Sequence, residues 1–236
     1  MTARHGPASV GGEPPAPLTR IATGSSAEMV ARLLAVSFPG AETVLDATWG
    51  RGKFWDGSDR HVVGCDISPH GKPAVVADFT RLPFADGSFS VVVFDPPYLS
   101  NTSKKGTSLV GKRFGSYRTE PEARASIQAG AREAWRVARV GVIVKVMDQI
   151  HASRLVRMNQ WVEEVIPVDL YDLAYLVSKS KPEDPKWQKH GPPLSVRSNC
   201  TSWLVFRHDG PIHKRRQHAV GPARQGGFWE TEGVAG

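Results

Sequence analysis

The chain has only two cysteines among its 236 residues, Cys65 and Cys200. They lie far apart and neither belongs to a C-x-x-C pair, which excludes a disulfide framework and a cysteine-rich zinc cluster. Long apolar runs are absent as well, since none approaches the roughly 18 residues of a membrane span, and no apolar signal segment follows a basic start. We therefore expect a soluble, cytoplasmic protein with no membrane partner.

Acidic residues are in the minority. The 23 Asp and Glu stand against 30 Lys and Arg, which gives a formal net charge of +7 and favours a polyanionic partner such as nucleic acid. Hydrophobic residues make up 40% and charged residues 22%, values that exclude a largely disordered, collagen-like or coiled-coil chain. The eight histidines show no ligand-like spacing, so we expect no metal site.

Short apolar runs separated by turn residues predict strands, and periodic apolar positions behind helix caps predict helices. Because strands and helices alternate, we expect an α/β fold with a Rossmann-like, doubly wound and mostly parallel sheet covered by helices on both faces. The predicted strands are 43–45, 61–64, 74–77, 90–94, 140–146, 165–168 and 201–207, and the predicted helices are 25–38, 119–138 and 151–162.

The ends of the chain and two inserts depart from this alternation. Residues 1–20 are rich in Pro, Gly and Ala and are predicted to be a disordered arm. One domain is expected over 21–208, with inserts at 99–118 and 178–199, and a basic, flexible tail over 209–236. Long inserts in compact domains are usually functional or disordered.

Three successive predicted strands end in an acid. Asp46 runs into a loop with Gly50 and Gly52, where glycines let a ligand approach the backbone and meet its N–H groups. Asp66 lies 20 residues after Asp46, the spacing at which a carboxylate takes the hydroxyls of a ribose. Each feature alone is also typical of a tight turn or a helix cap, but three together indicate a nucleoside site.

The third acid, Asp78, is followed by Phe79. This carboxylate is placed to accept from an adenine amino group, and the ring offers an apolar face. A nicotinamide site would use similar parts, yet Trp55 occupies the place of the third glycine of G-x-G-x-x-G, which disfavours a dehydrogenase.

A buried-type strand over 90–94 then stops at Asp95, followed by Pro96, Pro97 and Tyr98. Two prolines stiffen the backbone and fix an aromatic residue beside the acid. A simple strand followed by a proline turn needs neither the acid nor the ring, so this tetrapeptide favours a catalytic reading.

The pattern Asp46-x-x-x-Gly50-x-Gly52 with Asp95-Pro96-Pro97-Tyr98 resembles the class I S-adenosylmethionine-dependent amino-methyltransferases, in particular small phage-type DNA adenine-N6 or cytosine-N4 methylases. The resemblance spans 21–208 and implies a seven-stranded sheet whose one antiparallel strand is 201–207. It implies S-adenosylmethionine as cofactor and DNA as partner. The implied catalytic residues are Asp95, Pro96, Pro97 and Tyr98, and the implied cofactor-binding residues are Asp46, Thr48, Gly50, Gly52, Asp66, Ile67, Asp78 and Phe79.

The amino nitrogen of a base is a poor nucleophile because its lone pair is delocalised into the ring. Asp95 and the backbone carbonyl of Pro96 or Pro97 would accept its two N–H bonds and favour a pyramidal nitrogen aimed at the methyl donor. Tyr98 would stack on the target ring, which leaves the helix if the substrate is a duplex.

Five basic residues in the first insert are the candidate nucleic-acid contacts. The segment carries no acid, so it is either a loop that closes over the phosphate backbone or a solvated basic loop. The five are Lys104, Lys105, Lys112, Arg113 and Arg118.

Two other readings remain open beside DNA methylation, for which Asp rather than Ser at position 95 favours adenine N6 over cytosine N4. Related RNA guanine-N2 methyltransferases also use the tetrapeptide D-P-P-Y. A nucleic-acid-binding module that binds the cofactor without activity is the alternative from a different class.

Overall fold

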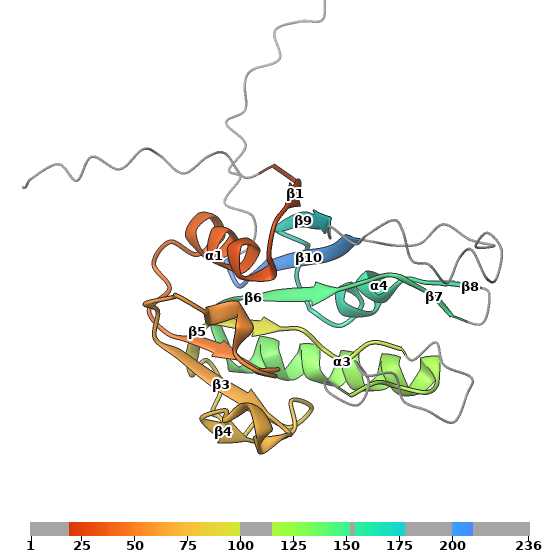
Figure 1. The fold of residues 1–236 in the computed structure, drawn as a ribbon, viewed down its shortest axis with the longest axis horizontal. Helices are drawn as coiled ribbons and strands as arrows, with labels where there is room; N and C mark the ends of the chain where they lie inside the picture. Colours follow the sequence, from red (N-terminus) through yellow and green to blue (C-terminus); the bar gives the residue numbers. More distant parts are fainter. Residues whose placement is uncertain (1–18, 100–114, 152–153, 178–199, 210–236) are drawn as a thin grey trace, which may run out of the picture.

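The computed structural model of the protein describes residues 19–99, 115–151, 154–177 and 200–209. Its centre is an eight-stranded sheet with the strand order β4-β3-β2-β5-β6-β10-β9-β1 (Figure 1). The α/β fold predicted from the sequence is confirmed. The strands are β1 (Ile21–Thr23), β2 (Val44–Asp46), β3 (Val62–Asp66), β4 (Val75–Val76), β5 (Phe89–Phe94), β6 (Ala138–Val146), β9 (Asp172–Val177) and β10 (Cys200–Arg207).

Neighbouring strands of this sheet are parallel except at β10, which runs antiparallel to both β6 and β9. The antiparallel strand expected over 201–207 is therefore confirmed. The sheet has eight strands rather than the expected seven, because β1 forms an additional edge strand beside β9. Just before β1, the Arg20 carbonyl already accepts from the Tyr175 N–H at 2.6 Å.

The strand order reverses next to β2. From β2 the chain moves outward to β3 and β4, then returns to place β5 on the other side of β2. The register pairs Asp46, the last residue of β2, with Gly64 of β3 and with Val93 of β5, so the carboxyl-terminal parts of the three strands lie side by side. In open α/β sheets this switch point, at the carboxyl ends of the strands, is where ligands bind.

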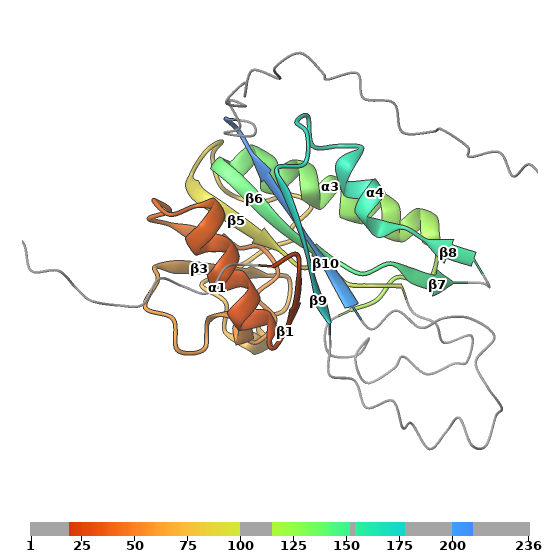
Figure 2. The same ribbon diagram turned by 90° about the horizontal axis from the view of Figure 1, so that it is seen from above.

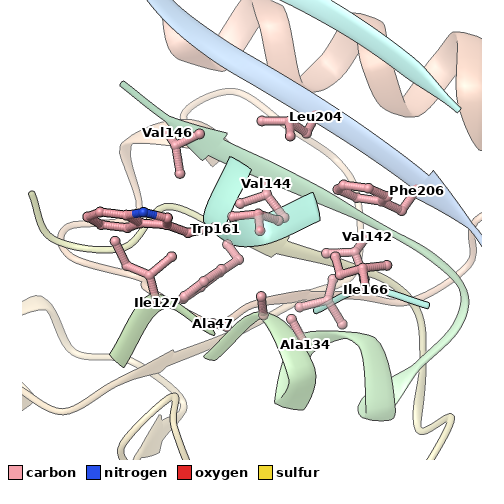
Figure 3. Close-up of a cluster of buried hydrophobic side chains, with 14 of the residues drawn as sticks. Ala47, Ile127, Ala134, Val142, Val144, Val146, Trp161, Ile166, Leu204 and Phe206 are labelled. Carbon is pink, nitrogen blue, oxygen red and sulfur yellow. The ribbon is translucent and has the colours of Figure 1, made fainter. Parts of the chain in front are cut away.

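Helices cover both faces of the sheet, as the sequence predicts. Figure 2 shows α1 (Ser26–Ser37) on one face and α3 (Glu120–Val137) with α4 (Met158–Glu163) on the other. Two separate buried clusters correspond to the two faces. Figure 3 shows the α3 side, where helix residues such as Ile127 pack towards Val144 of β6.

The starts of α1 and α3 follow from local sequence. Ser25 accepts from the Glu28 N–H at 3.1 Å and Glu28 accepts from the Ser25 N–H at 2.9 Å, which is the predicted capping box. Thr119 caps α3 through its side chain, which accepts from the Glu122 N–H, without the return bond of a capping box. Small residues on α3 let it lie close to the sheet, since a Cβ on Gly130 would meet the rings of Phe79 and Phe94.

The helix predicted over 151–162 is wrong for its first half. The strands β7 (Gln149–His151) and β8 (Arg154–Val156) form a two-stranded antiparallel ribbon, and α4 begins only at Met158. Cross-strand pairing of Ile150 with Leu155 replaces the helical pattern there. Buried residues recur at helical spacing only from Met158 to Trp161 and Val162, so the shorter helix follows the apolar period.

The strand predicted over 165–168 is also wrong, since the next strand is β9. The N–H groups of Val165 and Ile166 both donate back to the Val162 carbonyl, which continues the end of α4 rather than a ladder. Pro167 has no N–H to offer a neighbouring strand. These residues pack on the core as a connection to β9.

Several predicted segments fall outside the described residues: 1–18 of the arm, 100–114 of the first insert, the insert over 178–199 and the tail beyond 209. Within the described part of the chain, none of the helices has the length and apolar character to cross a membrane.

Candidate active site

The four acids singled out in the sequence meet at one edge of the sheet. Asp46 and Asp66 are the last residues of β2 and β3, Asp78 follows β4 by two positions, and Asp95 directly follows β5. Because these strands are parallel, all four carboxylates lie at the same, carboxyl-terminal edge. The structure thus brings together residues that are up to 49 positions apart, from 46 to 95.

The loop after β2 is a tight turn held by its own side chains. Gly50 and Gly52 adopt φ of 55° and 68°, the left-handed region that favours glycine. The Gly50 N–H donates to Asp66 Oδ2 at 2.7 Å, which ties the turn to the end of β3. The Trp49 indole N–H donates to the Gly71 carbonyl at 2.9 Å, and its ring fills the space beside Gly52 and Gly64.

This turn differs from the sequence-based expectation in one respect. The N–H groups expected to face a ligand are bonded within the protein: Trp49 donates to the Cys65 carbonyl at 2.9 Å and Gly52 donates to the Trp49 carbonyl at 2.8 Å. The glycines therefore serve to fold the turn back onto β3. What the turn offers a ligand is closeness of its backbone rather than these N–H donors.

Asp46 lies under this turn and is almost fully buried. Its carboxylate accepts from the Trp55 indole N–H at 2.7 Å and from the Thr48 N–H at 3.0 Å. Burial raises the pKa of Asp46 to about 7, because desolvation outweighs these hydrogen bonds and the carboxylates of Asp95 and Asp66 add repulsion. Asp46 therefore fastens Trp55 and the turn to β2.

The raised pKa of Asp46 predicts a pH-dependent stability. The folded state holds the Asp46 proton more tightly than the unfolded chain, so its contribution is present at low pH and lost as pH rises from about 4 to about 7. Relative to Asp46→Asn, the wild type should lose up to about 1.4 kcal/mol of unfolding free energy per pH unit in that window. Urea unfolding of both proteins between about pH 5 and pH 8 measures it.

The asparagine loses one hydrogen bond at every pH, which shifts its curve by a constant and leaves the difference in slope intact. Asp59→Asn, on an exposed position, is the matched control and should run parallel to the wild type. Parallel curves for Asp46→Asn would contradict the raised pKa.

Asp95 stands at the end of β5 beside the glycine turn. Its N–H donates to Thr48 Oγ1 at 2.8 Å, which couples the two loops directly. The Asp95 side chain is 21% exposed, so the carboxylate is partly open rather than sealed in the core. The corner formed by Asp95 and the two prolines thus adjoins the turn that ends β2, as the sequence-based hypothesis requires.

Tyr98 lies beside Asp95 and makes a contact that the sequence did not predict. Its hydroxyl donates to Asp95 Oδ1 at 3.0 Å and its ring packs on the buried cluster of the α3 face. Burial and the neighbouring carboxylate of Asp95 raise the pKa of Tyr98 well above its ordinary value, so the hydroxyl stays protonated and keeps donating. In this arrangement Tyr98 orients the carboxylate, and its ring is partly used by the core.

Lys145 is the residue of this site that the sequence analysis missed. It lies on β6, and its Nζ is 2.7 Å from Asp95 Oδ2, with both side chains largely buried at 14% and 21% exposure. The sequence does contain an indication of this role, because a lysine within the apolar strand 140–146 needs a polar or charged partner when it is buried. Which partner it finds depends on β5 and β6 being neighbours.

Of the residues expected around a nucleoside, some are exposed and others already make contacts within the protein. Ile67 is 69% exposed directly after Asp66, and Asp78 is exposed with Oδ1 accepting from the Thr80 N–H and hydroxyl at 2.8 Å. Asp66 already accepts from the N–H groups of Gly50 and Ser68. Phe79 packs edge-on against Phe94, with ring centroids 5.1 Å apart, so part of its face belongs to the core.

Four of the five basic residues of the first insert, Lys104, Lys105, Lys112 and Arg113, lie outside the described residues. Arg118 is described and exposed. The two ends of the insert meet, since Leu99 bridges to Tyr117 and the Tyr117 N–H donates to the Tyr98 carbonyl at 3.2 Å. Both ends of the basic segment are therefore anchored at the Asp95 corner. In the described part of the chain, no group of three or more His, Cys, Asp or Glu could hold a metal ion.

Comparison with known proteins gives matches among solved structures alone: no protein-family model and no curated protein matches the chain. A Pyrococcus horikoshii protein is 17% identical, with a TM-score of 0.46 and coverage of 76% of this chain and 88% of that one. A Burkholderia thailandensis 1,6-didemethyltoxoflavin N1-methyltransferase with bound S-adenosylhomocysteine is 13% identical, with a TM-score of 0.46 and coverage of 78% of both chains.

The magnesium protoporphyrin IX methyltransferase of Synechocystis, with bound S-adenosylmethionine, is 15% identical, with a TM-score of 0.44 and coverage of 77% of both chains. Likenesses this distant carry no argument about what this chain binds or converts.

Proposed function

We propose that the protein transfers the methyl group of S-adenosylmethionine to an exocyclic amino group of a DNA base, adenine N6 first and cytosine N4 second. The observation that carries the proposal is the junction of two loops. The Asp95 N–H donates to Thr48 Oγ1 at 2.8 Å, which places a partly open carboxylate and two rigid prolines next to the glycine turn after β2. A nucleoside-type site and an amine-binding corner thereby share one edge of the sheet.

The residues present fit S-adenosylmethionine. The partly exposed carboxylate of Asp66 and the exposed one of Asp78, at the ends of β3 and β4, favour a ligand that carries positive charge. Asp66 uses two of its roughly four lone-pair positions on backbone N–H groups, which leaves acceptors for ribose hydroxyls. The exposed Ile67 offers an apolar contact to an adenine, and Asp78 has a free carboxylate oxygen for its amino group.

The turn itself adds a close approach. A Cβ on Gly52 would strike the Trp49 ring, and its φ of 68° lies in the left-handed region, so this position requires glycine. Thr48, Gly50 and Gly52 would lie along the methionine part of the cofactor. The bound cofactor supplies an electrophilic methyl group.

The corner at Asp95 would prepare the acceptor nitrogen. The Asp95 carboxylate and the carbonyl of Pro96 or Pro97 accept the two N–H bonds of the amino group, which favours a pyramidal nitrogen with its lone pair directed away from the ring. The prolines keep the carbonyl still, and the Tyr98 hydroxyl holds Asp95 Oδ1. After the nitrogen accepts the methyl group it becomes acidic, and Asp95 or water takes the proton.

Nucleic acid fits the surroundings of this corner. The insert over 99–118 carries five Lys and Arg and no acid, and near its two ends Leu99 bridges to Tyr117 beside Tyr98. A base inside a duplex cannot reach a carboxylate at a sheet edge, so it must be flipped out or belong to a single strand. We expect the basic side chains of this insert to hold the phosphates of that strand.

The test is nucleoside mass spectrometry. Amplified DNA, which carries no modified bases, is incubated with the protein and S-adenosylmethionine, digested, and analysed for N6-methyldeoxyadenosine and N4-methyldeoxycytidine. A parallel reaction with transcribed RNA is analysed for N2-methylguanosine, and a reaction without cofactor is the blank. We expect methylated adenine in DNA; methylation confined to RNA, or none with either substrate, would overturn the proposal.

A further inference from the structure

Lys145 and Asp95 form an ion pair in the candidate site, in which Lys145 is the hydrogen-bond donor and Asp95 the acceptor. Nζ lies 2.7 Å from Oδ2, so a donor and an acceptor stand side by side from two neighbouring strands. The side chains of Lys145 and Asp95 are 14% and 21% exposed, so both are largely buried and both keep some contact with solvent. The pair is therefore part of the surface that an acceptor base would meet.

The position of the Lys145 ammonium is restricted on its other sides. The ring of Phe54 lies 5.3 Å from Nζ and the ring of Trp203 lies 5.8 Å from it, both within cation-π range. An ammonium has three N–H donors, and among the described residues Asp95 is the hydrogen-bond acceptor recorded for it. Donors thus remain for a ligand that approaches Asp95.

From this geometry we infer that Lys145 recognises the ring nitrogen next to the target amino group. This inference rests on the proposed function and narrows its substrate class to bases with an amidine edge, in which an amino donor adjoins an unprotonated ring nitrogen. Asp95 accepts from the amino group, and Lys145 donates to the ring nitrogen beside it.

Adenine presents this edge as its 6-amino group and N1, and cytosine presents it as its 4-amino group and N3. On guanine, the 2-amino group adjoins an N1–H donor on the pairing edge and an unprotonated N3 only on the sugar side, so a guanine bound by its pairing edge would turn N1–H towards the ammonium. A site that hydrogen-bonds a ligand atom rejects analogues lacking it, because its own buried group is left unpaired. Lys145 thus acts in selection of the base.

The contact belongs to recognition more than to the chemical step. A cation at the ring nitrogen draws the amino lone pair further into the ring, so it does not make the nitrogen a better nucleophile. Loss of Lys145 should therefore raise KM for the nucleic acid more than it lowers kcat. This split separates the role from that of Asp95, whose loss should mainly reduce kcat.

A base-analogue cycle tests the inference. Random-sequence oligonucleotides are synthesised with adenine, 1-deazaadenine or 7-deazaadenine, and methylation is measured for the wild type and for Lys145→Met, which keeps the side-chain length against Phe54 and Trp203. For the wild type, 1-deazaadenine should lower kcat/KM about ten- to a hundredfold and 7-deazaadenine should not. For Lys145→Met, adenine should already show that loss, and 1-deazaadenine should add only the effect that the analogue has on the nucleophile itself.

The cycle cancels the effect of the analogue on the nucleophile, because that effect is equal in both enzymes. If the first assay finds cytosine methylated, 3-deazacytosine takes the place of 1-deazaadenine. Binding of the same oligonucleotides to protein saturated with S-adenosylhomocysteine repeats the comparison without turnover. Lys145→Arg, which keeps a charged donor, should retain the penalty for the deaza analogue.

Arg124→Met removes a surface ion pair, Arg124 with Glu164 at 2.6 Å, and is the matched control; it should leave the pattern unchanged. An equal penalty for 1-deazaadenine in wild type and Lys145→Met overturns this inference and leaves the proposed function standing. Absence of methylation on every natural nucleic acid overturns the proposed function itself.

Discussion

Asp95→Ala should lower kcat for base methylation by about a hundredfold or more and leave the affinity for S-adenosylhomocysteine within about threefold. The side chain supplies one of the two acceptors for the amino group, and its removal leaves only a backbone carbonyl at the corner. Its backbone N–H, which donates to Thr48 Oγ1, is kept in the variant, so the link to the glycine turn survives. Rate and affinity should therefore separate.

The measurement pairs single-turnover methylation with calorimetric titration of S-adenosylhomocysteine. Alanine leaves the largely buried Lys145 without its carboxylate partner, so thermal unfolding is followed in parallel and Asp95→Asn, which keeps the shape, serves as a second variant. Asp59→Ala on the surface is the control. Near-normal turnover in a folded Asp95→Ala protein would show that the catalytic assignment is wrong.

Gly71→Ala should weaken S-adenosylhomocysteine binding by about tenfold or more and lower the unfolding free energy by about 1 to 3 kcal/mol. A Cβ at Gly71 would overlap the Gly50 carbonyl group and press on the Trp49 ring. The turn cannot retreat easily, since the Gly50 N–H is held by Asp66 and the Trp49 indole by the Gly71 carbonyl. Displacement of this turn would carry away the backbone expected to lie along the cofactor.

Gly40→Ala is the matched control, because a Cβ at Gly40 has no atom within 4 Å. Titration calorimetry and urea unfolding of the two variants and the wild type give both quantities. Equal affinity of all three proteins for S-adenosylhomocysteine would show that the glycine turn is not part of the cofactor site. Equal unfolding free energy would show that the turn yields more easily than its contacts indicate.

Local sequence predicted a large part of the fold. The capping box at Ser25 and Glu28, the caps of α3 and the apolar runs of β5 and β6 depend on residues within a few positions of one another, and the structure confirms each. Local patterns failed over 151–162, because the pairing of Ile150 with Leu155 is decided by contact between strands and not by helical spacing.

The acids of the candidate site were predictable for a related reason. Asp46, Asp66 and Asp95 each end or follow a strand, and parallel strands carry their carboxyl ends to one edge, so alternation of elements is enough to gather them. The hydrogen bonds that these carboxylates accept within the protein were not predictable. Asp66 accepts from the N–H groups of Gly50 and Ser68, which only the fold of the turn reveals.

The sequence by itself determined the α/β class, the edge of the sheet at which chemistry is expected and the corner at Asp95, because each depends on the type of residue at the end of a strand. Only the tertiary structure decided that Lys145 and the Tyr98 hydroxyl converge on that carboxylate. Lys145 lies 50 positions further along the chain, and a pair of buried charges becomes visible only when β5 and β6 are placed side by side.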